Sequence, residues 1–226
     1  MTARPAIISV LLAEDHDVVR QGLCSLLQTD GHFAVVGEAH TGREAVAMAK
    51  ALRPDVILMD IAMPILNGLD ATRQILAQQP SARVLILSAH SDDEYLERSA
   101  NAGVMGFLEK QTSAEILTKA ICEVAKGNIF FSPSITKRLA REVGKRSTSH
   151  MQAAKKLSPR ESEVLQLVAE GATNKQVASD LGISIKTVEK HRQHLMDKLG
   201  IHDTAGLTRF AISSGVIESS VQLTVT

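Results

Sequence analysis

The most informative part of the sequence is PDVILMD at residues 54–60, an apolar run that ends in the carboxylate of Asp60. The residues that follow it, IAMPILNG at 61–68, contain the Pro and Gly that are typical of a loop. A short apolar run bounded by turn residues indicates a buried strand. We therefore expect Asp60 at the carboxyl end of a buried strand, directly ahead of a loop.

Three further apolar runs end in polar side chains in the same way. They are IISVLLA (7–13) before Glu14 and Asp15, VLIL (84–87) before Ser88, and VMGFLE (104–109) before Lys110. Taken alone, each polar residue has an ordinary explanation as a helix cap, a strand end or a solvated loop residue. Their occurrence at successive strand ends, together with Asp60, favours one shared site instead.

Helical patterns alternate with the apolar runs over the first 126 residues. The expected strands lie near 7–13, 33–37, 55–59, 83–87 and 104–108, and the expected helices near 17–28, 42–51, 68–78, 92–101 and 113–126. This alternation predicts an α/β fold, a flavodoxin-like, doubly wound, five-stranded parallel sheet covered on both faces. In that strand order the first and third strands are neighbours at the switch point, where ligands bind at the carboxyl ends. Glu14, Asp15 and Asp60 should therefore converge.

Three clustered carboxylates predict a cation site. They repel one another, so that at least one pKa rises unless a cation neutralises them. Oxygen ligands with few direct carboxylates suit Mg²⁺, which would also shield Asp60 from an anionic phosphoryl donor. Asp60 is then the expected nucleophile, with the Lys110 ammonium and the Ser88 hydroxyl available to the phosphoryl oxygens.

Residues 7–126 resemble the receiver domain of bacterial two-component response regulators. The resemblance is carried by Glu14-Asp15, by Asp60 with Met63-Pro64 and Gly68, and by Ser88 and Lys110. It implies that Asp60 is the phosphoacceptor, that Glu14, Asp15, Asp60 and the Ala62 backbone carbonyl surround Mg²⁺, and that Ser88 and Lys110 sense the phosphoryl group.

Three positions depart from the receiver pattern. Glu14 is one methylene longer than the Asp often found there, which would let it reach the ion through water. Phe107 occupies the place of the phosphoryl-sensing switch aromatic but lacks the hydroxyl of the common Tyr, so it can signal only by packing. Gln111 stands where Pro often follows the lysine, which leaves the geometry of the Lys110-Gln111 peptide open.

Two rival functions use similar residues. A haloacid-dehalogenase-like phosphatase also has a strand-end Asp nucleophile with Mg²⁺, but it needs a second Asp two residues on, where Ala62 stands. A receiver that works without phosphorylation is expected to have lost an acid or Lys110, and all of these are present. We therefore expect no enzyme, beyond Mg²⁺-dependent phosphoryl transfer to the chain itself and autodephosphorylation.

Length and charge predict two domains with different partners. The chain has 226 residues, of which 44% are hydrophobic and 22% charged, enough for two cores. Residues 1–130 hold 11 Lys and Arg against 16 Asp and Glu, a net −5, and residues 131–226 hold 14 against 9, a net +5. We expect a receiver domain at 1–130, a linker with a short helix at 131–156, and a second, basic domain at 157–226, whose partner should differ from that of the first.

Cysteine spacing and hydropathy point to the cytoplasm. Cys24 and Cys122 lack metal-ligand spacing and fall in helical patterns, so we expect them to be reduced core residues. No stretch reaches the roughly 20 apolar residues of a membrane span, and the start does not read as a signal peptide. A cytoplasmic protein without membrane attachment is expected.

The second domain reads as an all-α, four-helix unit. SPRE at 158–161 is a capping box with Pro at the first helical position, and Gly171 ends that helix. Further helices are expected near 174–181, 185–199 and 204–214, with GIS at 182–184 as a tight turn. Two short helices joined by such a turn predict a helix-turn-helix, whose second helix enters the DNA major groove.

The third of these helices separates into two faces. Val188, His191, Leu195 and Leu199 recur at helical spacing and should face the core. On the opposite face, Glu189, Lys190 and Gln193 have the chemistry to read bases. Residues that could contact phosphates are Lys175, Ser184, Lys186, Thr187 and Arg192. A merely solvated charged face is the alternative, and the net +5 and the tight turn count against it.

Residues 157–217 resemble the LuxR-type output module of NarL/FixJ response regulators. The resemblance is carried by LSPRE (157–161), GATNK (171–175), LGIS (181–184), KTVEKH (186–191) and KLG (198–200). It implies dimerisation on DNA through the fourth helix, where Leu207, Phe210 and Ala211 can face the core. The outer face of that helix then consists of Ala205, Thr208 and Ile212.

Together the two halves predict a response regulator for transcription. A sensor histidine kinase would phosphorylate it, and it would bind double-stranded DNA as a homodimer. Phosphorylation could act by releasing an inhibited output domain or by pairing receivers. The sequence leaves both routes open.

Overall fold

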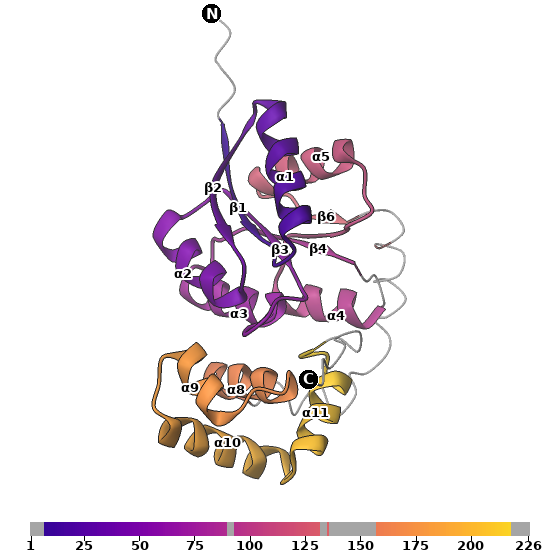
Figure 1. Ribbon diagram of the computed structural model, residues 1–226. Coiled ribbons are helices and arrows are strands. Elements are labelled where there is room, and N and C mark those ends of the chain that lie inside the picture. Colours follow the sequence, from indigo (N-terminus) through magenta and orange to yellow (C-terminus); the bar gives the residue numbers. More distant parts are fainter. Residues whose placement is uncertain (1–6, 90–92, 132–134, 136–156, 218–226) are drawn as a thin grey trace, which may run out of the picture. The chain divides into compact units, whose positions relative to one another are not determined.

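The computed structural model describes residues 7–89, 93–131, 135 and 157–217. The chain forms two compact units, the first made mostly of residues up to 144 and the second of residues from 145 onward (Figure 1). The expected linker and short helix at 131–156 lie almost wholly outside the described residues. The predicted domain limits at 130 and 157 therefore stay a prediction.

The first unit is a parallel sheet in the order β2-β1-β3-β4-β5-β6. Its strands are β1 (Ile8–Ala13), β2 (Phe33–Ala39), β3 (Val56–Asp60), β4 (Val84–Ser88), β5 (Gly106–Glu109) and β6 (Phe130–Phe131). Its helices are α1 (Asp17–Asp30), α2 (Gly42–Leu52), α3 (Gly68–Gln78), α4 (Asp93–Ala102) and α5 (Ala114–Ala125). Helices α1 and α5 cover one face and α2, α3 and α4 the other (Figure 1), which confirms the doubly wound fold.

The central strands explain why the apolar runs are so clear. Every residue of β3 and β4 is buried, as expected for strands with helices on both faces. Ala13 on β1 pairs with Met59 on β3. The residues that follow, Glu14 and Asp60, are thereby brought to the same edge of the sheet.

The sheet has a sixth strand where five were predicted. Phe130–Phe131 pairs in parallel with β5, and the Phe130 N–H donates to the Met105 carbonyl at 2.9 Å. A two-residue strand has no periodicity of its own, so it depends on this pairing. Gly106 permits the close approach, because a Cβ there would lie 2.6 Å from the Phe130 carbonyl oxygen.

The two cysteines correct a smaller expectation. Cys24 and Cys122 are free, but both are only half-buried, packing at the edge of the core and not inside it. Partial burial raises the pKa of each thiol.

The second unit consists of α8 (Pro159–Ala169), α9 (Asn174–Leu181), α10 (Ile185–Leu199) and α11 (Thr204–Ser213). The predicted capping box is present, since the Ser158 side chain accepts from the Glu161 N–H and Glu161 accepts from the Ser158 N–H. A second capping box, Thr173 with Gln176, begins α9. Their apolar sides enclose one core, which includes Val164, Leu165, Val177, Val188, Leu195 and Leu207.

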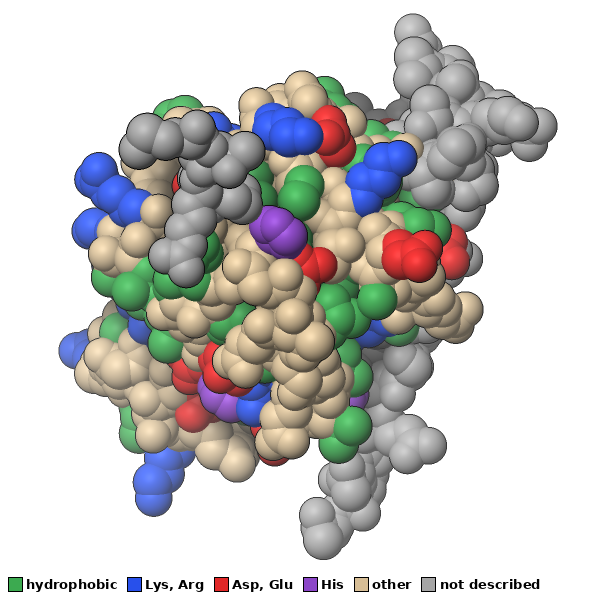
Figure 2. Space-filling model, turned by 90° about the horizontal axis from the view of Figure 1, so that it is seen from above, with side chains coloured by type: hydrophobic (Ala, Val, Ile, Leu, Met, Phe, Trp, Pro, Cys, Tyr) green, Lys and Arg blue, Asp and Glu red, His purple; other side chains and the backbone are tan. Residues whose placement is uncertain are grey.

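The surface mixes charges of both signs. Figure 2 shows one face of the molecule, on which basic, acidic and apolar side chains of the described residues are interspersed. Among the described residues, no helix is both long and apolar enough to cross a membrane.

Candidate functional site

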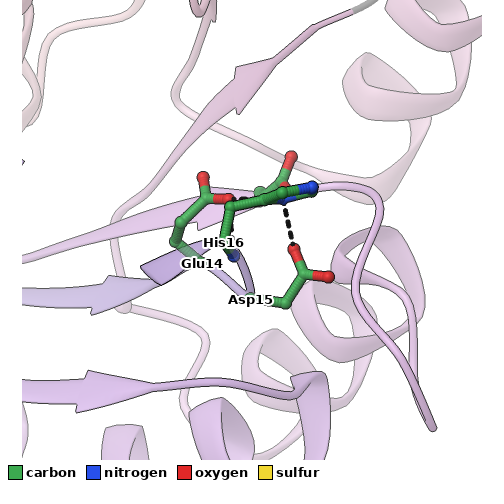
Figure 3. Close-up of side chains that lie close together, drawn as sticks. Glu14, Asp15 and His16 are labelled. Carbon is green, nitrogen blue, oxygen red and sulfur yellow. Dashed lines mark hydrogen bonds and ion pairs between the residues drawn. The ribbon is translucent and has the colours of Figure 1, made fainter. Parts of the chain in front are cut away.

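The expected acid cluster forms at the carboxyl ends of β1 and β3. Glu14 and Asp60 are almost fully buried, at 2% and 3% exposure, and Asp15 lies between buried and exposed. Ligand atoms of Glu14, Asp15, His16 and Asp60 all lie within 4.8 Å of one another. Figure 3 shows that the side chains of Glu14, Asp15 and His16 lie close together.

Lys110 closes the pocket from the loop after β5. Its ammonium nitrogen lies 2.9 Å from Asp60 Oδ2, and 3.0 and 2.8 Å from the two carboxylate oxygens of Glu14. Burial disfavours the charged ammonium, but the charge of Asp60 and the bonds to both carboxylates outweigh it and raise the pKa of Lys110. The backbone N–H of Lys110 donates to the Ser88 carbonyl at 2.8 Å, which connects the loop to the end of β4.

Electrostatics single out Asp60 within the cluster. Burial raises the pKa of Asp60 to about 7, and the negative charge of Glu14 adds to the rise, against the opposing charge of Lys110. Two buried oxygens, Glu14 Oε2 and Asp15 Oδ1, accept no hydrogen bond. Their close contacts are ionic, with Lys110 at 2.8 Å and, where His16 is protonated, with its Nδ1 at 2.9 Å. A pocket of carboxylate oxygens left in this state could hold a metal ion.

The loop after Asp60 folds back onto its own strand. The Gly68 N–H donates to the Ile61 carbonyl at 2.8 Å, and a Cβ on Gly68 would lie 1.8 Å from the Asp60 carbonyl oxygen. Only glycine fits this approach. Ala62, two residues after Asp60, lies in the loop and is partly exposed.

The remaining predicted receiver residues, Ser88 and Phe107, lie on the neighbouring strands β4 and β5. Ser88 ends β4 with 1% exposure, and Phe107 on β5 is fully buried. Among the described residues no peptide bond is cis, so the Lys110-Gln111 peptide is trans.

The sequence patterns do not predict two neighbours of the acid pair, His16 and Arg20. His16 is the N-cap residue of α1, yet its side chain makes no cap hydrogen bond; its Nδ1 lies 3.1 Å from Glu14 Oε1. Arg20 is buried behind the pair and donates to the Glu14 carbonyl oxygen at 3.0 Å. The place of His16 directly after Glu14-Asp15 is the signal that could have identified it.

The faces of α10 lie as the period predicts. Val188 and Leu195 are buried, and His191 and Leu199 are partly so. The expected base-reading residues Glu189, Lys190 and Gln193 are exposed. The Gln193 side-chain amide donates to Asp197 Oδ1 at 2.8 Å, along the same face.

The phosphate candidates fall into two groups. Lys175 and Lys186 are exposed, and the Ser184 and Thr187 hydroxyls lie 2.8 Å apart at the start of α10. Arg192 differs from these. Its guanidinium donates to Asn174 Oδ1 at 2.8 Å and to Thr204 Oγ1 at 3.3 Å, so it connects α10 to the starts of α9 and α11.

The outer face of α11 is also as expected. Leu207, Phe210 and Ala211 are buried. Ala205 is exposed, Ile212 keeps 41% of its surface exposed, and Thr208 is partly exposed with its hydroxyl donating to the Thr204 carbonyl. An exposed Ile beside Ala and Thr leaves an apolar strip on this helix.

Both units match known families. Residues 10–122 match the response regulator receiver domain, and residues 155–211 match the bacterial regulatory proteins of the luxR family.

Two curated relatives match this chain over nearly their whole length. The chain is 38% identical over 217 residues to the transcriptional regulatory protein MctR of Rhizobium johnstonii, covering 96% of this chain and 98% of MctR. It is 35% identical over 211 residues to the response regulator protein VraR of Staphylococcus aureus, covering 93% and 99%. A solved structure of the two-component response regulator RcsB in complex with DNA aligns with a TM-score of 0.56 and 28% identity, over 92% of this chain and 98% of that one. The chain therefore belongs to the two-component response regulators of the LuxR/NarL family, transcription regulators that join a receiver domain to a luxR-type DNA-binding domain.

Proposed function

We propose that a sensor histidine kinase phosphorylates this regulator on Asp60, and that the phosphoryl group controls sequence-specific binding to double-stranded DNA. The observation that carries the proposal is the position of Asp60, which is buried beside Glu14 and 2.9 Å from the Lys110 ammonium. At this position the Asp60 carboxylate lies beside other carboxylates, which can bind a metal ion, and beside a fixed positive charge on Lys110. Phosphoryl transfer relies on such positive charges to stabilise the transferred group.

Mg²⁺ is the cation that this donor set suits best. Glu14, Asp15 and Asp60 would hold it, with the Ala62 backbone carbonyl as a further ligand. The buried oxygens without hydrogen bonds support this assignment, because hard carboxylate oxygens are the ligands that Mg²⁺ prefers. When bound, the ion supplies the positive charge that lets an anionic donor approach an anionic nucleophile.

The residues of the chain have separate roles in the transfer. An Asp60 carboxylate oxygen attacks phosphorus, a bond forms between them, and the bond from phosphorus to the donor's imidazole nitrogen breaks. Lys110 neutralises charge on the transferred group, and the Ser88 hydroxyl donates a hydrogen bond to it. Phe107 then repacks. In autodephosphorylation, water attacks the phosphorus of the acyl phosphate, which releases inorganic phosphate and restores the Asp60 carboxylate. We expect no other enzymatic activity.

Binding to DNA would use the exposed face of α10. Glu189, Lys190 and Gln193 would contact base edges, and the exposed Lys175, Ser184 and Lys186, with the partly exposed Thr187, would contact phosphates and set the register. A homodimer on DNA would form through Ala205, Thr208 and Ile212 of α11. The similarity to RcsB, whose structure was solved with DNA, supports this role. A regulator that is phosphorylated by a sensor kinase and binds DNA would work in the cytoplasm.

Mass measurement on a chemically phosphorylated sample tests the proposal. Acetyl phosphate with Mg²⁺ should add one phosphoryl group to the wild type and none to Asp60→Asn. Asp70→Asn on α3, whose carboxylate pairs with Arg73, is the matched control and should still be phosphorylated. Addition to the Asp60→Asn variant, or equal addition in excess EDTA, would contradict the assignment. DNA binding measured on the same samples should change only where Asp60 is modified.

A further inference from the structure

We propose that Arg20 is a positioning residue that fixes the acid pair of the receiver in the geometry that binds the divalent cation. The inference rests on the proposed function, because it assigns a role toward the same cation. Arg20 does not touch the ligand oxygens. It acts through the backbone from which they project.

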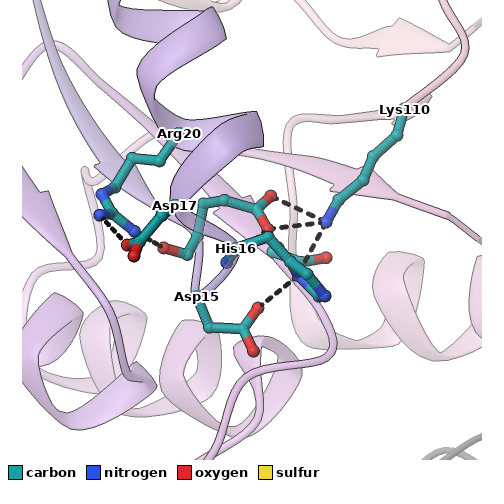
Figure 4. A network of polar contacts seen from close by, with 7 residues as sticks. Asp15, His16, Asp17, Arg20 and Lys110 are labelled. Carbon is teal, nitrogen blue, oxygen red and sulfur yellow. Dashed lines mark hydrogen bonds and ion pairs between the residues drawn. The ribbon is translucent and has the colours of Figure 1, made fainter.

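The guanidinium of Arg20 is buried and donates a hydrogen bond from each of its three nitrogens. Its residue is 5% exposed. Nη1 donates to the Glu14 carbonyl oxygen at 3.0 Å, Nε donates to Glu38 Oε2 at 3.1 Å, and Nη2 bonds the Asp17 carboxylate. Figure 4 shows Arg20 and Asp17 on one side of the site and Lys110 on the other.

These bonds join three elements at one point. Glu14 follows β1, Glu38 lies on β2, and Asp17 begins α1. The Glu14 carbonyl belongs to the peptide that links Glu14 to Asp15, so the guanidinium fixes the unit that carries both acidic side chains. A planar guanidinium holds several acceptors in a set direction, which a single ammonium cannot do.

The start of α1 needs this tether. Its N-cap residue, His16, makes no side-chain cap bond and turns its imidazole toward Glu14 and Asp15 instead. The carboxylates of Glu14, Asp15 and Asp60 also repel one another, which pushes the Glu14-Asp15 segment away from β3. Arg20 resists that movement from behind the segment. Its own charge is matched by Asp17 and Glu38, which lie outside the ligand set.

Mg²⁺ titration of the full-length Arg20→Met variant tests this role. Melting temperature against Mg²⁺ concentration gives the affinity, since a ligand that binds only the folded state stabilises it. Loss of a residue that orients metal ligands typically weakens metal binding by about 10 to 100-fold, and we expect a rise of that size in the Mg²⁺ dissociation constant. The phosphorylation rate at saturating Mg²⁺ should return to within a few-fold of the wild type. A merely structural role would lower that maximal rate and leave the Mg²⁺ midpoint unmoved.

Two further variants complete the experiment. Arg73→Met on α3 removes an arginine with the same i,i+3 pairing to an aspartate, and its Mg²⁺ midpoint should match the wild type. Arg20→Lys keeps one donor for the Glu14 carbonyl and should give an intermediate midpoint, which also serves if Arg20→Met does not fold. A folded Arg20 variant that binds Mg²⁺ within twofold of the wild type overturns the inference and leaves the proposed function standing. A wild type that binds no Mg²⁺ overturns both.

Discussion

At the scale of single residues, the Asp60 carboxylate faces two opposed requirements. It must be ionised to attack phosphorus, yet burial and the charge of Glu14 raise its pKa to about 7. Lys110 offsets part of that rise from 2.9 Å away. Without a metal ion the site therefore disfavours the ionised form of the Asp60 carboxylate, and a bound cation would favour it.

The stability of the metal-free protein should consequently depend on pH. The folded pKa of Asp60 lies above its unfolded value of 3.8, so its contribution is fully present below about pH 4 and is lost as pH rises through about 7. At about 1.4 kcal/mol per pKa unit, the loss amounts to a few kcal/mol at most. Urea unfolding in EDTA across this range should show the decline in the wild type, and Asp60→Asn should lack it. Mg²⁺ should also bind more tightly above pH 7 than at pH 6, where a proton must leave first.

Residues on α10 should separate by the kind of contact they make. Lys190→Ala or Gln193→Ala should relax preference at particular base pairs by about 1 to 3 kcal/mol, whereas Lys186→Ala should weaken binding to all sequences and lower the salt slope by about one unit. Binding to randomised DNA at two salt concentrations measures both effects. Unchanged base preference in the Lys190 and Gln193 variants would mean that another face enters the groove.

At the scale of elements, the turn from β3 into α3 depends on one close approach. A Cβ on Gly68 would lie 1.8 Å from the Asp60 carbonyl oxygen, a backbone atom that cannot swing aside. The same turn fixes the position of Asp60. A side chain at position 68 should therefore both destabilise the loop and displace Asp60 in the site.

A pair of glycine substitutions tests that connection. Gly68→Ala should destabilise the first unit by about 1 to 3 kcal/mol or more, because overpacking forces the backbone to move. Gly22→Ala in α1 meets no atom within 4 Å and should stabilise by about 0.5 to 1 kcal/mol. Urea unfolding of both variants provides the comparison. A Gly68→Ala protein as stable as the wild type would show that the loop can move aside.

Elements with a strong local pattern are the ones that the sequence predicts. β3 and β4 are apolar throughout because helices cover both their faces, and α10 separates into faces because one side meets the core. β6 could not be predicted, since two residues form a strand only by pairing with β5. The Arg20 tether could not be predicted either. Its partner Glu38 lies on a different strand, and no spacing rule relates the two.

The candidate site follows the same division. Glu14, Asp15, Asp60 and Lys110 converge because parallel strands deliver their ends to one edge of the sheet. His16 was not predicted because its position suggests a helix cap, and only the structure shows that its imidazole turns toward the acids.

At the scale of the whole molecule, a net −5 in residues 1–130 stands against a net +5 in residues 131–226. The basic half suits DNA phosphates, and a single small helical unit makes few base contacts. Specific binding should therefore need two copies on a repeated half-site. Phosphorylation can raise affinity only by as much as it discriminates between two states of the protein.

DNA affinity and sedimentation of the full chain, with and without phosphorylation, should distinguish the two routes of activation. Residues 152–226 alone should bind at least as well as the unphosphorylated full chain if phosphorylation releases an inhibited domain. They should bind only when artificially dimerised if it acts by pairing. If phosphorylation changes neither the DNA affinity nor the association state of the full chain, the proposal that phosphorylation controls DNA binding is contradicted.

Pairing through α11 has its own test. Ile212→Asp places a charge on the exposed apolar strip and should abolish paired binding on a two-half-site DNA while leaving single-site binding intact. Ser213→Asp adds the same charge to the neighbouring exposed position and should pair normally. Equal pairing by both variants would move the interface elsewhere.

The sheet order has a consequence for solubility. The strand order places β2 and β6 at the two edges of the sheet, and β2, with seven residues against two in β6, is the edge that can recruit a strand from another chain. Val36 is exposed there, and Glu38 nearby places a carboxylate at the same edge. That charge discourages edge-to-edge association, and the bond from Arg20 holds it in place. We therefore expect the contact between Arg20 and Glu38 to lower the tendency of the receiver to aggregate through this edge.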